Sequence, residues 1–152
     1  MRWAGEVRNG PVLDLACGSG RHARYFRDLG YEVAALDREP VSLEEVSFVK
    51  ADLEDGSPWP LEGRRFGAIV VTNYLHRPLF PKIAASLDEG GLLVYETFML
   101  GNERFGKPSN PAFLLKPGEL KAAFSSLTVL AFEEGEVSRP KPAMVQRIAA
   151  RR

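Results

Sequence analysis

The sequence predicts a doubly wound α/β fold, in which a mostly parallel seven-stranded sheet has helices on both faces and ends in an antiparallel hairpin. Short runs rich in β-branched residues alternate with helical stretches, which is typical of a parallel sheet. The last two runs, at 127–132 and 144–149, have Gly135, Pro140 and Pro142 between them and no helical pattern. This spacing predicts the C-terminal hairpin.

The first unit comprises a strand at 12–17, a helix at 21–29 and a strand at 31–37. Gly18 and Gly20 end the first strand, after which apolar residues recur on one helical face. Gly30 stands where a left-handed residue commonly ends a helix. The second strand closes on an acid, Asp37.

The middle of the chain carries predicted strands at 46–51, 66–72 and 92–98, with a helix at 80–87. Asp52 and Leu53 directly follow the first of these strands. The segment 54–65 holds two prolines and two glycines, so we expect a loop where many proteins of this fold have a helix. We expect 89–91 to form the turn into the strand at 92–98.

A long segment, 101–116, precedes a helix at 117–124. It is longer than most connections in a compact domain and could reach roughly 50 Å at about 3.3 Å per residue. We expect it to fold over a functional cleft as a lid, with Asn102, Arg104 and Lys107 supplying polar contacts. The alternative is a surface loop fixed by its prolines.

Composition limits the classes of function. The 152 residues, 45% hydrophobic and 26% charged, predict a single globular domain over 1–152. Twenty basic residues balance twenty acidic ones, so no overall field favours nucleic acid or an anionic membrane. The oligomeric state, monomer or dimer, stays open.

One cysteine and two distant histidines exclude a disulfide framework and a multi-cysteine zinc site. We therefore expect no bound metal and a reducing, cytoplasmic setting. Residues 1–10 contain Arg2, Glu6 and Arg8 and no apolar run, so neither a signal peptide nor a membrane anchor is expected.

The strongest functional signal is the glycine turn between the first strand and the first helix. Glycines at 18 and 20 allow a sharp turn and let the backbone approach a ligand closely. Asp37 lies nineteen residues after Gly18, close to the spacing at which an acid binds ribose hydroxyls. Two further acids are Asp14, inside the first strand just before the turn, and Asp52, at the end of the third strand, so the sequence predicts a nucleoside site.

A dinucleotide site is the alternative, because Gly18-x-Gly20-x-x-Ala23 also satisfies a looser dinucleotide fingerprint. Three acids around one cleft suit a ligand with a ribose, an adenine amine and a positive centre better than a pyrophosphate. The C-terminal hairpin also stands where a second mononucleotide-binding half would be expected.

These residues resemble the class I S-adenosylmethionine-dependent methyltransferases, which have a Rossmann-like fold. Residues 12–20 resemble the family's first motif, Asp37 its ribose acid, Asp52-Leu53 its adenine-side pair and 73–77 the segment after its fourth strand. Residues 95–98, 106–111 and 113–115 are similar to a bacterial subgroup that includes tellurite-resistance and thiopurine methyltransferases. Only about eleven residues precede the first strand, so the N-terminal helices of many relatives are expected to be absent or shortened.

The resemblance implies S-adenosylmethionine as cofactor, S-adenosylhomocysteine as product and a small-molecule acceptor. It assigns the cofactor to Asp14, Ala16, Cys17, Gly18, Gly20, Arg21, His22, Asp37, Arg38, Asp52, Leu53 and Asn73. On this assignment Cys17 packs near the cofactor and is not a nucleophile.

The acceptor is expected at the carboxyl ends of the fourth and fifth strands, where open α/β sheets bind ligands. We assign His76, Tyr74 and Glu96 to the acceptor side. His76 has an ordinary pKa near neutrality that suits a base, although an exposed loop histidine is the alternative. Glu96 is expected to face either the cleft or a cation such as Arg77.

Methyl transfer is an in-line displacement in which alignment contributes most, so whether a general base is used stays open. Two other interpretations also stay open at this point: a nicotinamide-dependent oxidoreductase and a non-catalytic module that binds S-adenosylmethionine. The sequence does not identify the acceptor.

Overall fold

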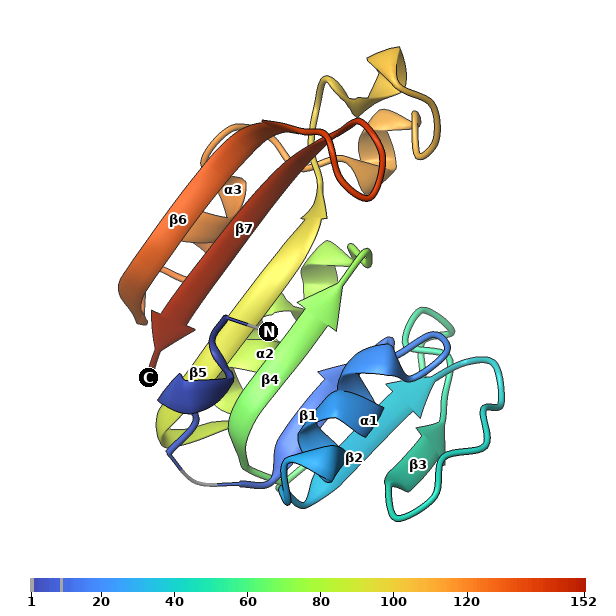
Figure 1. The fold of residues 1–152 in the computed structure, drawn as a ribbon, viewed down its shortest axis with the longest axis vertical. Coiled ribbons are helices and arrows are strands. Elements are labelled where there is room, and N and C mark those ends of the chain that lie inside the picture. Colours follow the sequence, from blue (N-terminus) through green and yellow to red (C-terminus); the bar gives the residue numbers. More distant parts are fainter. Residues whose placement is uncertain (1, 9) are drawn as a thin grey trace.

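The computed structural model describes residues 2–8 and 10–152, which form a seven-stranded sheet in the order β3-β2-β1-β4-β5-β7-β6 (Figure 1). The parallel strands are β1 (Val12–Leu15), β2 (Val33–Asp37), β3 (Ser47–Lys50), β4 (Phe66–Thr72) and β5 (Leu87–Phe98). β6 (Thr128–Val137) and β7 (Ala143–Arg151) form an antiparallel hairpin, and β7 runs antiparallel to β5. The predicted fold class is confirmed.

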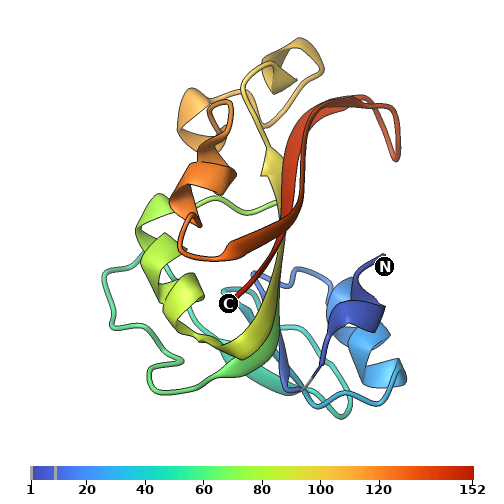
Figure 2. The same ribbon diagram turned by 90° about the vertical axis from the view of Figure 1, so that its left-hand side faces the viewer.

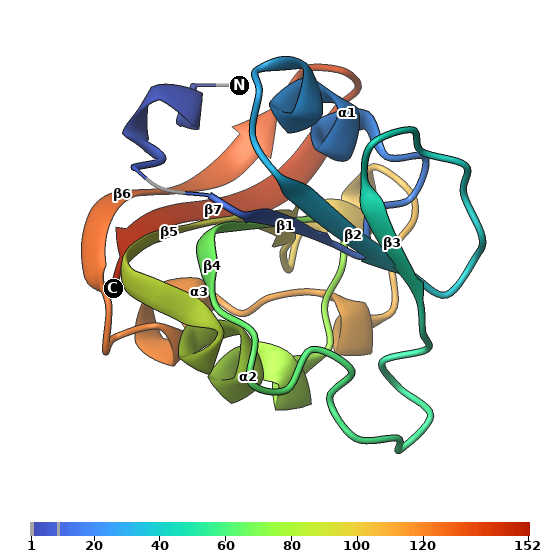
Figure 3. The same cartoon turned by 90° about the horizontal axis from the view of Figure 1, so that it is seen from below.

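Helices cover both faces of the sheet, as Figures 2 and 3 show. One face carries α1 (Arg21–Asp28) and the short 3-10 helix η1 (Ala4–Glu6). The other carries α2 (Phe80–Ala85) and α3 (Glu119–Ala123). None of the helices among the described residues combines the length and apolar character that crossing a bilayer requires.

Strand alternation divides the core between these two layers. In β1, Val12 packs with Ala23 and Phe26 of α1, whereas Leu13 and Leu15 belong to the cluster beneath α2 and α3. Both faces of β1 and nearly all of β4 are buried, as expected for central parallel strands.

The loop at 54–65 carries no helix, as predicted, and covers part of the sheet with side chains instead. Trp59 and Leu61 are 8% and 1% exposed and join the core on the α2 and α3 face. Apolar burial by these two residues substitutes there for the packing that a crossover helix would supply.

The predicted turn at 89–91 is wrong, and so is the helix end at 87. α2 ends at Ala85 and β5 already begins at Leu87. Phe66 pairs with Leu87 and Ala68 pairs with Leu92, so 88–91 form a bulge within the strand. Gly91 permits this close approach, because a Cβ there would lie 2.8 Å from the Asp88 carbonyl oxygen and 3.0 Å from that of Phe66.

The hairpin is longer than the sequence indicates. Gly135 lies within β6 opposite Val145, so the connection between the strands is 138–142. Glu133 of β6 and Glu96 of β5 both lie opposite Arg147 of β7.

Candidate functional site

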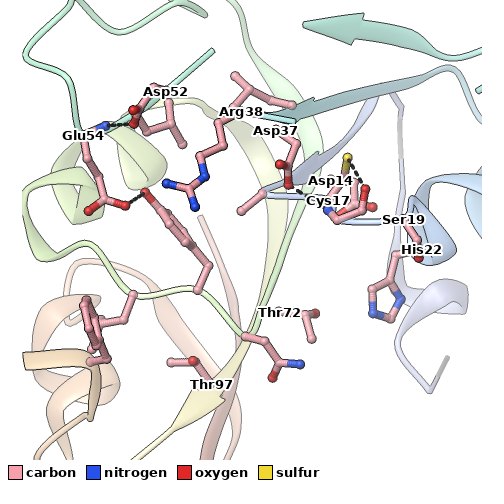
Figure 4. A pocket seen from close by; sticks show the side chains of 18 of the residues that line it. Asp14, Cys17, Ser19, His22, Asp37, Arg38, Asp52, Glu54, Thr72 and Thr97 are labelled. Carbon is pink, nitrogen blue, oxygen red and sulfur yellow. Dashed lines mark hydrogen bonds between the residues drawn. The ribbon is translucent and has the colours of Figure 1, made fainter. Parts of the chain in front are cut away.

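A cavity of about 880 Å³ lies at the carboxyl ends of the parallel strands (Figure 4). Its wall comes from the turn after β1, the ends of β2, β4 and β5, the segment after β3, and the loop at 101–116. The predicted cofactor residues on this wall are Asp14, Ala16, Cys17, Gly18, Arg21, His22, Asp37, Arg38, Asp52, Leu53 and Asn73. The twelfth, Gly20, directly precedes α1 and does not line the cavity. A Cβ at this position would lie 2.6 Å from a Leu43 methyl carbon.

The turn after β1 uses left-handed backbone conformations in quick succession. Ala16, Gly18 and Gly20 have φ of 56°, 56° and 85°. Glycine adopts such angles freely, whereas an L-residue such as Ala16 is strained there by roughly 1–2 kcal/mol. The turn brings the backbone to the cavity immediately before α1 begins at Arg21.

Ala16→Gly is expected to stabilise the fold by about 0.5–1 kcal/mol, because relief of the left-handed strain exceeds the entropy that glycine loses on folding. Urea unfolding would measure the difference. The matched change Ala122→Gly, on the exposed face of α3, should instead destabilise by about 1 kcal/mol. A destabilised Ala16→Gly protein would contradict the strain at this turn.

Asp37 is fixed in place by backbone amides at the end of β2. Its Oδ2 accepts from the Gly18 amide at 2.8 Å and its Oδ1 from the Glu39 amide at 3.0 Å. The carboxylate thus links the β1 turn to the end of β2 and lies on the cavity wall. Its oxygens retain lone pairs for ligand hydroxyls.

Asp14 is nearly buried, with 2% of its surface exposed, and its Oδ2 accepts from the Ala23 amide in the first turn of α1 at 3.0 Å. Burial raises its pKa from 3.8 to about 7, and the negative charge of Asp37 adds to the rise. A carboxylate in this position favours a cationic partner on the ligand side.

Cys17 lines the same cavity as these two acids. Burial, together with the charges of Asp14 and Asp37, raises the pKa of its thiol to about 12. The thiol is therefore protonated at neutral pH, which makes it a poor nucleophile.

A second polar group lies beyond β3. The Asp52 carboxylate accepts from the Glu54 amide at 2.9 Å, and the Glu54 carboxylate accepts from the Tyr74 hydroxyl at 3.0 Å. Arg38 extends between Asp37 and Glu54 in Figure 4. Glu54 was not among the predicted site residues, although its position two residues after the strand-end acid Asp52 was an available signal.

The three predicted acceptor-side residues do not converge on one point. Tyr74 lines the cavity, whereas His76 lies outside its wall with Nδ1 3.7 Å from Glu54 Oε1. Glu96 projects from the α1 face of β5 and pairs with Arg147, with 2.8 Å between Arg147 Nη2 and Glu96 Oε1. The partner is thus Arg147, where the sequence suggested Arg77.

Glu96 lines a second cavity of about 420 Å³ on the α1 face of the sheet. We refer to it as the second cavity; its lining residues are Arg2, Trp3, Arg21, His22, Tyr25, Thr72, Val94, Glu96, Ala131, Phe132, Glu133, Arg147, Ile148 and Ala149. Arg21, His22 and Thr72 line both cavities. In Figure 4, His22 and Thr72 lie on the side of the first cavity away from Asp52 and Glu54. Burial lowers the pKa of His22 and the charge of Arg21 lowers it further, so the ring is neutral at pH 7.

Several further residues that were not predicted complete the first cavity from β4, β5 and the loop at 101–116. These are Thr72, Thr97, Phe98, Pro108 and Phe113. Strand ends predict positions such as Thr72 and Thr97, but the folded path of the loop decides which of its residues reach the wall.

The loop at 101–116 folds as two 3-10 turns, η3 (Asn102–Arg104) and η4 (Pro111–Phe113). Asn102 is 2% exposed; its side chain donates to the Pro108 carbonyl at 2.9 Å and accepts from the Met144 amide at 3.0 Å. The prediction that it supplies a cleft contact is wrong, because its Nδ2 binds within the loop and its Oδ1 holds the loop to β7. Arg104 and Lys107 are exposed and lie outside the cavity wall.

Arg77 fixes the far end of the same loop, an arrangement that we call the Arg77 clamp. Its Nε and Nη2 bind both oxygens of Glu119 at 2.6 and 2.9 Å. It also donates to the carbonyl oxygens of Ala112 at 3.1 Å and Leu114 at 2.9 Å. Hydrogen bonding from Arg77 holds the pKa of Glu119 below its usual value.

Arg77→Lys is expected to destabilise the protein by about 1–2 kcal/mol, because an ammonium cannot reproduce the forked contacts with Glu119 and two carbonyls. Urea unfolding would measure stability, and limited proteolysis should show faster cleavage within 101–116. Arg139→Lys, on the exposed hairpin connection, is the matched control. Unchanged cleavage in Arg77→Lys would mean that the loop is held by other contacts.

Comparison with known proteins points to one kind of enzyme. A family model described as "Methyltransferase domain" matches residues 12–91. Malonyl-[acyl-carrier protein] O-methyltransferase of Pseudescherichia vulneris is 41% identical over 69 residues, which make up 41% of this chain and 26% of that protein. The matched part therefore spans about a quarter of the curated relative.

Solved structures share the fold at low sequence identity. TehB from Haemophilus influenzae superposes with a TM-score of 0.78 at 20% identity, covering 99% of this chain and 60% of TehB. A second structure is the Burkholderia thailandensis 1,6-didemethyltoxoflavin-N1-methyltransferase, solved with 1,6-didemethyltoxoflavin and S-adenosylhomocysteine. It superposes with a TM-score of 0.73 at 22% sequence identity, and the match covers 99% of this chain and 74% of that one. An S-adenosylmethionine-dependent methyltransferase from Mesorhizobium loti superposes with a TM-score of 0.73 at 19% sequence identity. The match covers 97% of this chain and 93% of that one.

Proposed function

The chain belongs to the class I S-adenosylmethionine-dependent methyltransferases, and on this basis we propose that it transfers a methyl group from S-adenosylmethionine to a small-molecule acceptor. One observation carries the site assignment. Asp14, Asp37 and Asp52 line a single cavity at or beyond the ends of three neighbouring strands, beside the glycine turn.

The residues of the first cavity fit this cofactor in charge and shape. Asp37 would bind the ribose hydroxyls, and Asp52 with Leu53 would bound the adenine. Asp14 and the turn at 16–18 would face the methionine part, whose ammonium and sulfonium are cationic and suit a buried carboxylate. When bound, S-adenosylmethionine supplies a methyl group on a positively charged sulfur, which makes the sulfur a good leaving group.

The contribution of the chain is mainly to orient the reactants. Well-oriented groups can lower a barrier by about 7–11 kcal/mol, whereas a general base typically adds about 10²–10⁴-fold. Phe98, Pro108 and Phe113 would exclude water from the cavity mouth. Tyr74 and His76 stay candidates for the acceptor side, although both are tied to Glu54.

A small acceptor is supported by the balanced charge of the chain and by the size of the cavities. Volumes of about 880 and 420 Å³ fall in the range of small-molecule sites. The Burkholderia enzyme, which shares the fold, was solved with 1,6-didemethyltoxoflavin. We further propose a single domain over 1–152 and, from the lone Cys17, a reducing compartment such as the cytoplasm.

Calorimetric titration with S-adenosylmethionine, S-adenosylhomocysteine and nicotinamide adenine dinucleotide tests the proposal. Micromolar affinity for both adenosyl ligands and none for the dinucleotide is the expected result. Binding of the dinucleotide alone would overturn the cofactor assignment. Adenosyl binding without methyl transfer across a broad panel of small acceptors would indicate a binding module.

A further inference from the structure

The second cavity adjoins the first. Arg21, His22 and Thr72 form a common wall between the two. Thr72 is the last residue of β4 and pairs in register with Glu96 of β5. A molecule in the second cavity would therefore contact side chains that also line the first cavity, on the side away from Asp52 and Glu54.

The chemistry of the second cavity differs from that of the first. Its apolar part includes Val94 and Ala149 on the sheet, Trp3 beside η1 and Tyr25 on α1. Its polar part includes the ion pair of Glu96 with Arg147, whose side chains are 37% and 40% exposed, together with Arg2, Arg21, His22, Thr72 and Glu133. A flat apolar body with polar groups at its edge matches this division.

Arg147 orients the Glu96 carboxylate. Arg147 lies directly opposite Glu96 in the β5–β7 register, and its Nη2 holds Oε1 at 2.8 Å. An ionised carboxylate only accepts hydrogen bonds, so a ligand at this edge must offer an N–H or O–H. A methylated product has lost that hydrogen and would bind less well.

Resting on the proposed function, we propose that the second cavity binds the methyl acceptor. We infer that the acceptor is a small aromatic molecule with a weakly acidic O–H or N–H, which donates to Glu96. The acceptor oxygen or nitrogen forms the new bond to the methyl carbon as the carbon–sulfur bond breaks and its electron pair stays on sulfur. The proton passes to the Glu96 carboxylate and from there to water.

Fluorescence of Trp3 provides a direct test, because the chain has two tryptophans and Trp59→Phe leaves Trp3 as the sole reporter. The probe is 4-nitrophenol at pH 5.5, where its hydroxyl is protonated; it is an aromatic O–H acid that quenches tryptophan emission. Saturable quenching is expected in Trp59→Phe. Quenching that never saturates up to millimolar probe would overturn the proposal.

Filling the cavity should abolish this binding. Ala131→Leu adds a branched side chain to the cavity wall and is expected to weaken 4-nitrophenol at least tenfold in the Trp59→Phe background. Ala122→Leu, which makes the same change on the exposed face of α3, should leave it unaltered. Equal binding in both variants would place the probe elsewhere.

The role of Glu96 is tested by comparing 4-nitrophenol with 4-nitroanisole, which carries a methyl in place of the hydroxyl hydrogen. The parent should prefer the phenol at least fivefold, and Glu96→Leu, which removes both acceptor oxygens, should lose most of that preference. Glu133→Leu is the matched control, because Glu133 also lines the cavity but its side chain is 56% exposed. A preference retained in Glu96→Leu would remove Glu96 from acceptor recognition.

Titration of S-adenosylhomocysteine into Ala131→Leu distinguishes failure of this inference from failure of the proposed function. Ala131 lies outside the first cavity, so cofactor affinity should stay within twofold of the parent. If the parent binds the cofactor but Ala131→Leu leaves 4-nitrophenol binding unchanged, only the proposed acceptor site is overturned. Absence of cofactor binding in the parent itself would overturn the proposed function.

Discussion

Asp37→Ala is expected to weaken S-adenosylhomocysteine binding by at least 100-fold. The carboxylate would accept two ribose hydroxyl protons, and each hydrogen bond to a charged group contributes about 1.5–3 kcal/mol. Loss of both corresponds to roughly 10²–10⁴ in affinity. Isothermal titration calorimetry on the parent and the variant would measure the ratio directly.

Two further variants separate ligand binding from turn geometry. Asp37 also accepts from the amides of Gly18 and Glu39, so removing it could loosen the turn. Asp37→Asn keeps an oxygen for one amide and should bind the ligand with intermediate affinity. Asp28→Asn, on an exposed acid at the end of α1, should leave affinity unchanged. Parent-like binding by Asp37→Ala would remove Asp37 from the nucleoside site.

Asp14→Asn is expected to stabilise the ligand-free protein by about 2–4 kcal/mol at pH 8 and to have little effect near pH 4. The folded pKa of about 7 exceeds the ordinary value of 3.8, so the folded state binds the Asp14 proton more tightly than the unfolded state does. This contribution to stability is fully present below pH 3.8. This contribution decreases as the pH rises toward 7. Above pH 7 the Asp14 side chain is ionised in the folded protein, and its buried charge then lowers the stability by the full amount.

Urea unfolding of the parent and Asp14→Asn between pH 4 and pH 8 would measure this difference. Asparagine can still accept from the Ala23 amide, so the substitution removes the charge and keeps the contact to α1. Asp88→Asn, on an exposed acid in the β5 bulge, should change stability by less than about 0.5 kcal/mol at every pH. A pH-independent difference for Asp14→Asn would contradict the raised pKa. The stabilised variant should also bind S-adenosylmethionine more weakly, as expected where a strained group serves binding.

Local signals predicted the parts of the fold that depend on neighbours in sequence. The glycines at 18 and 20 placed the first turn, and the absence of a helical pattern before β7 placed the hairpin. The bulge at 88–91 was missed because it depends on Gly91 approaching the backbone of Phe66, on another strand. In sequence, two consecutive glycines are as typical of a turn as of a bulge. Only the pairing of the strand with its neighbour distinguishes a turn before the strand from a bulge within it.

The candidate site also combines features that depend on sequence neighbours with features that depend on long-range contacts. Strand-end acids and the spacing from Gly18 to Asp37 predicted the side of the cavity that would face the nucleoside. The three residues assigned to the acceptor side do not line one cavity, because strand alternation carries Glu96 to the opposite face from its neighbour Tyr95. The anchoring role of Asn102 depends on a contact with Met144, forty-two residues away, and no local pattern encodes it.

The Arg77 clamp has a consequence for how quickly a ligand can enter. Pro108 and Phe113 are held at the cavity mouth by contacts within the protein itself, so this wall is ordered before any ligand arrives. A wall that is already ordered loses little further freedom on association. Binding should therefore proceed in one kinetic phase whose rate rises linearly with ligand concentration, without a slow loop closure after the encounter.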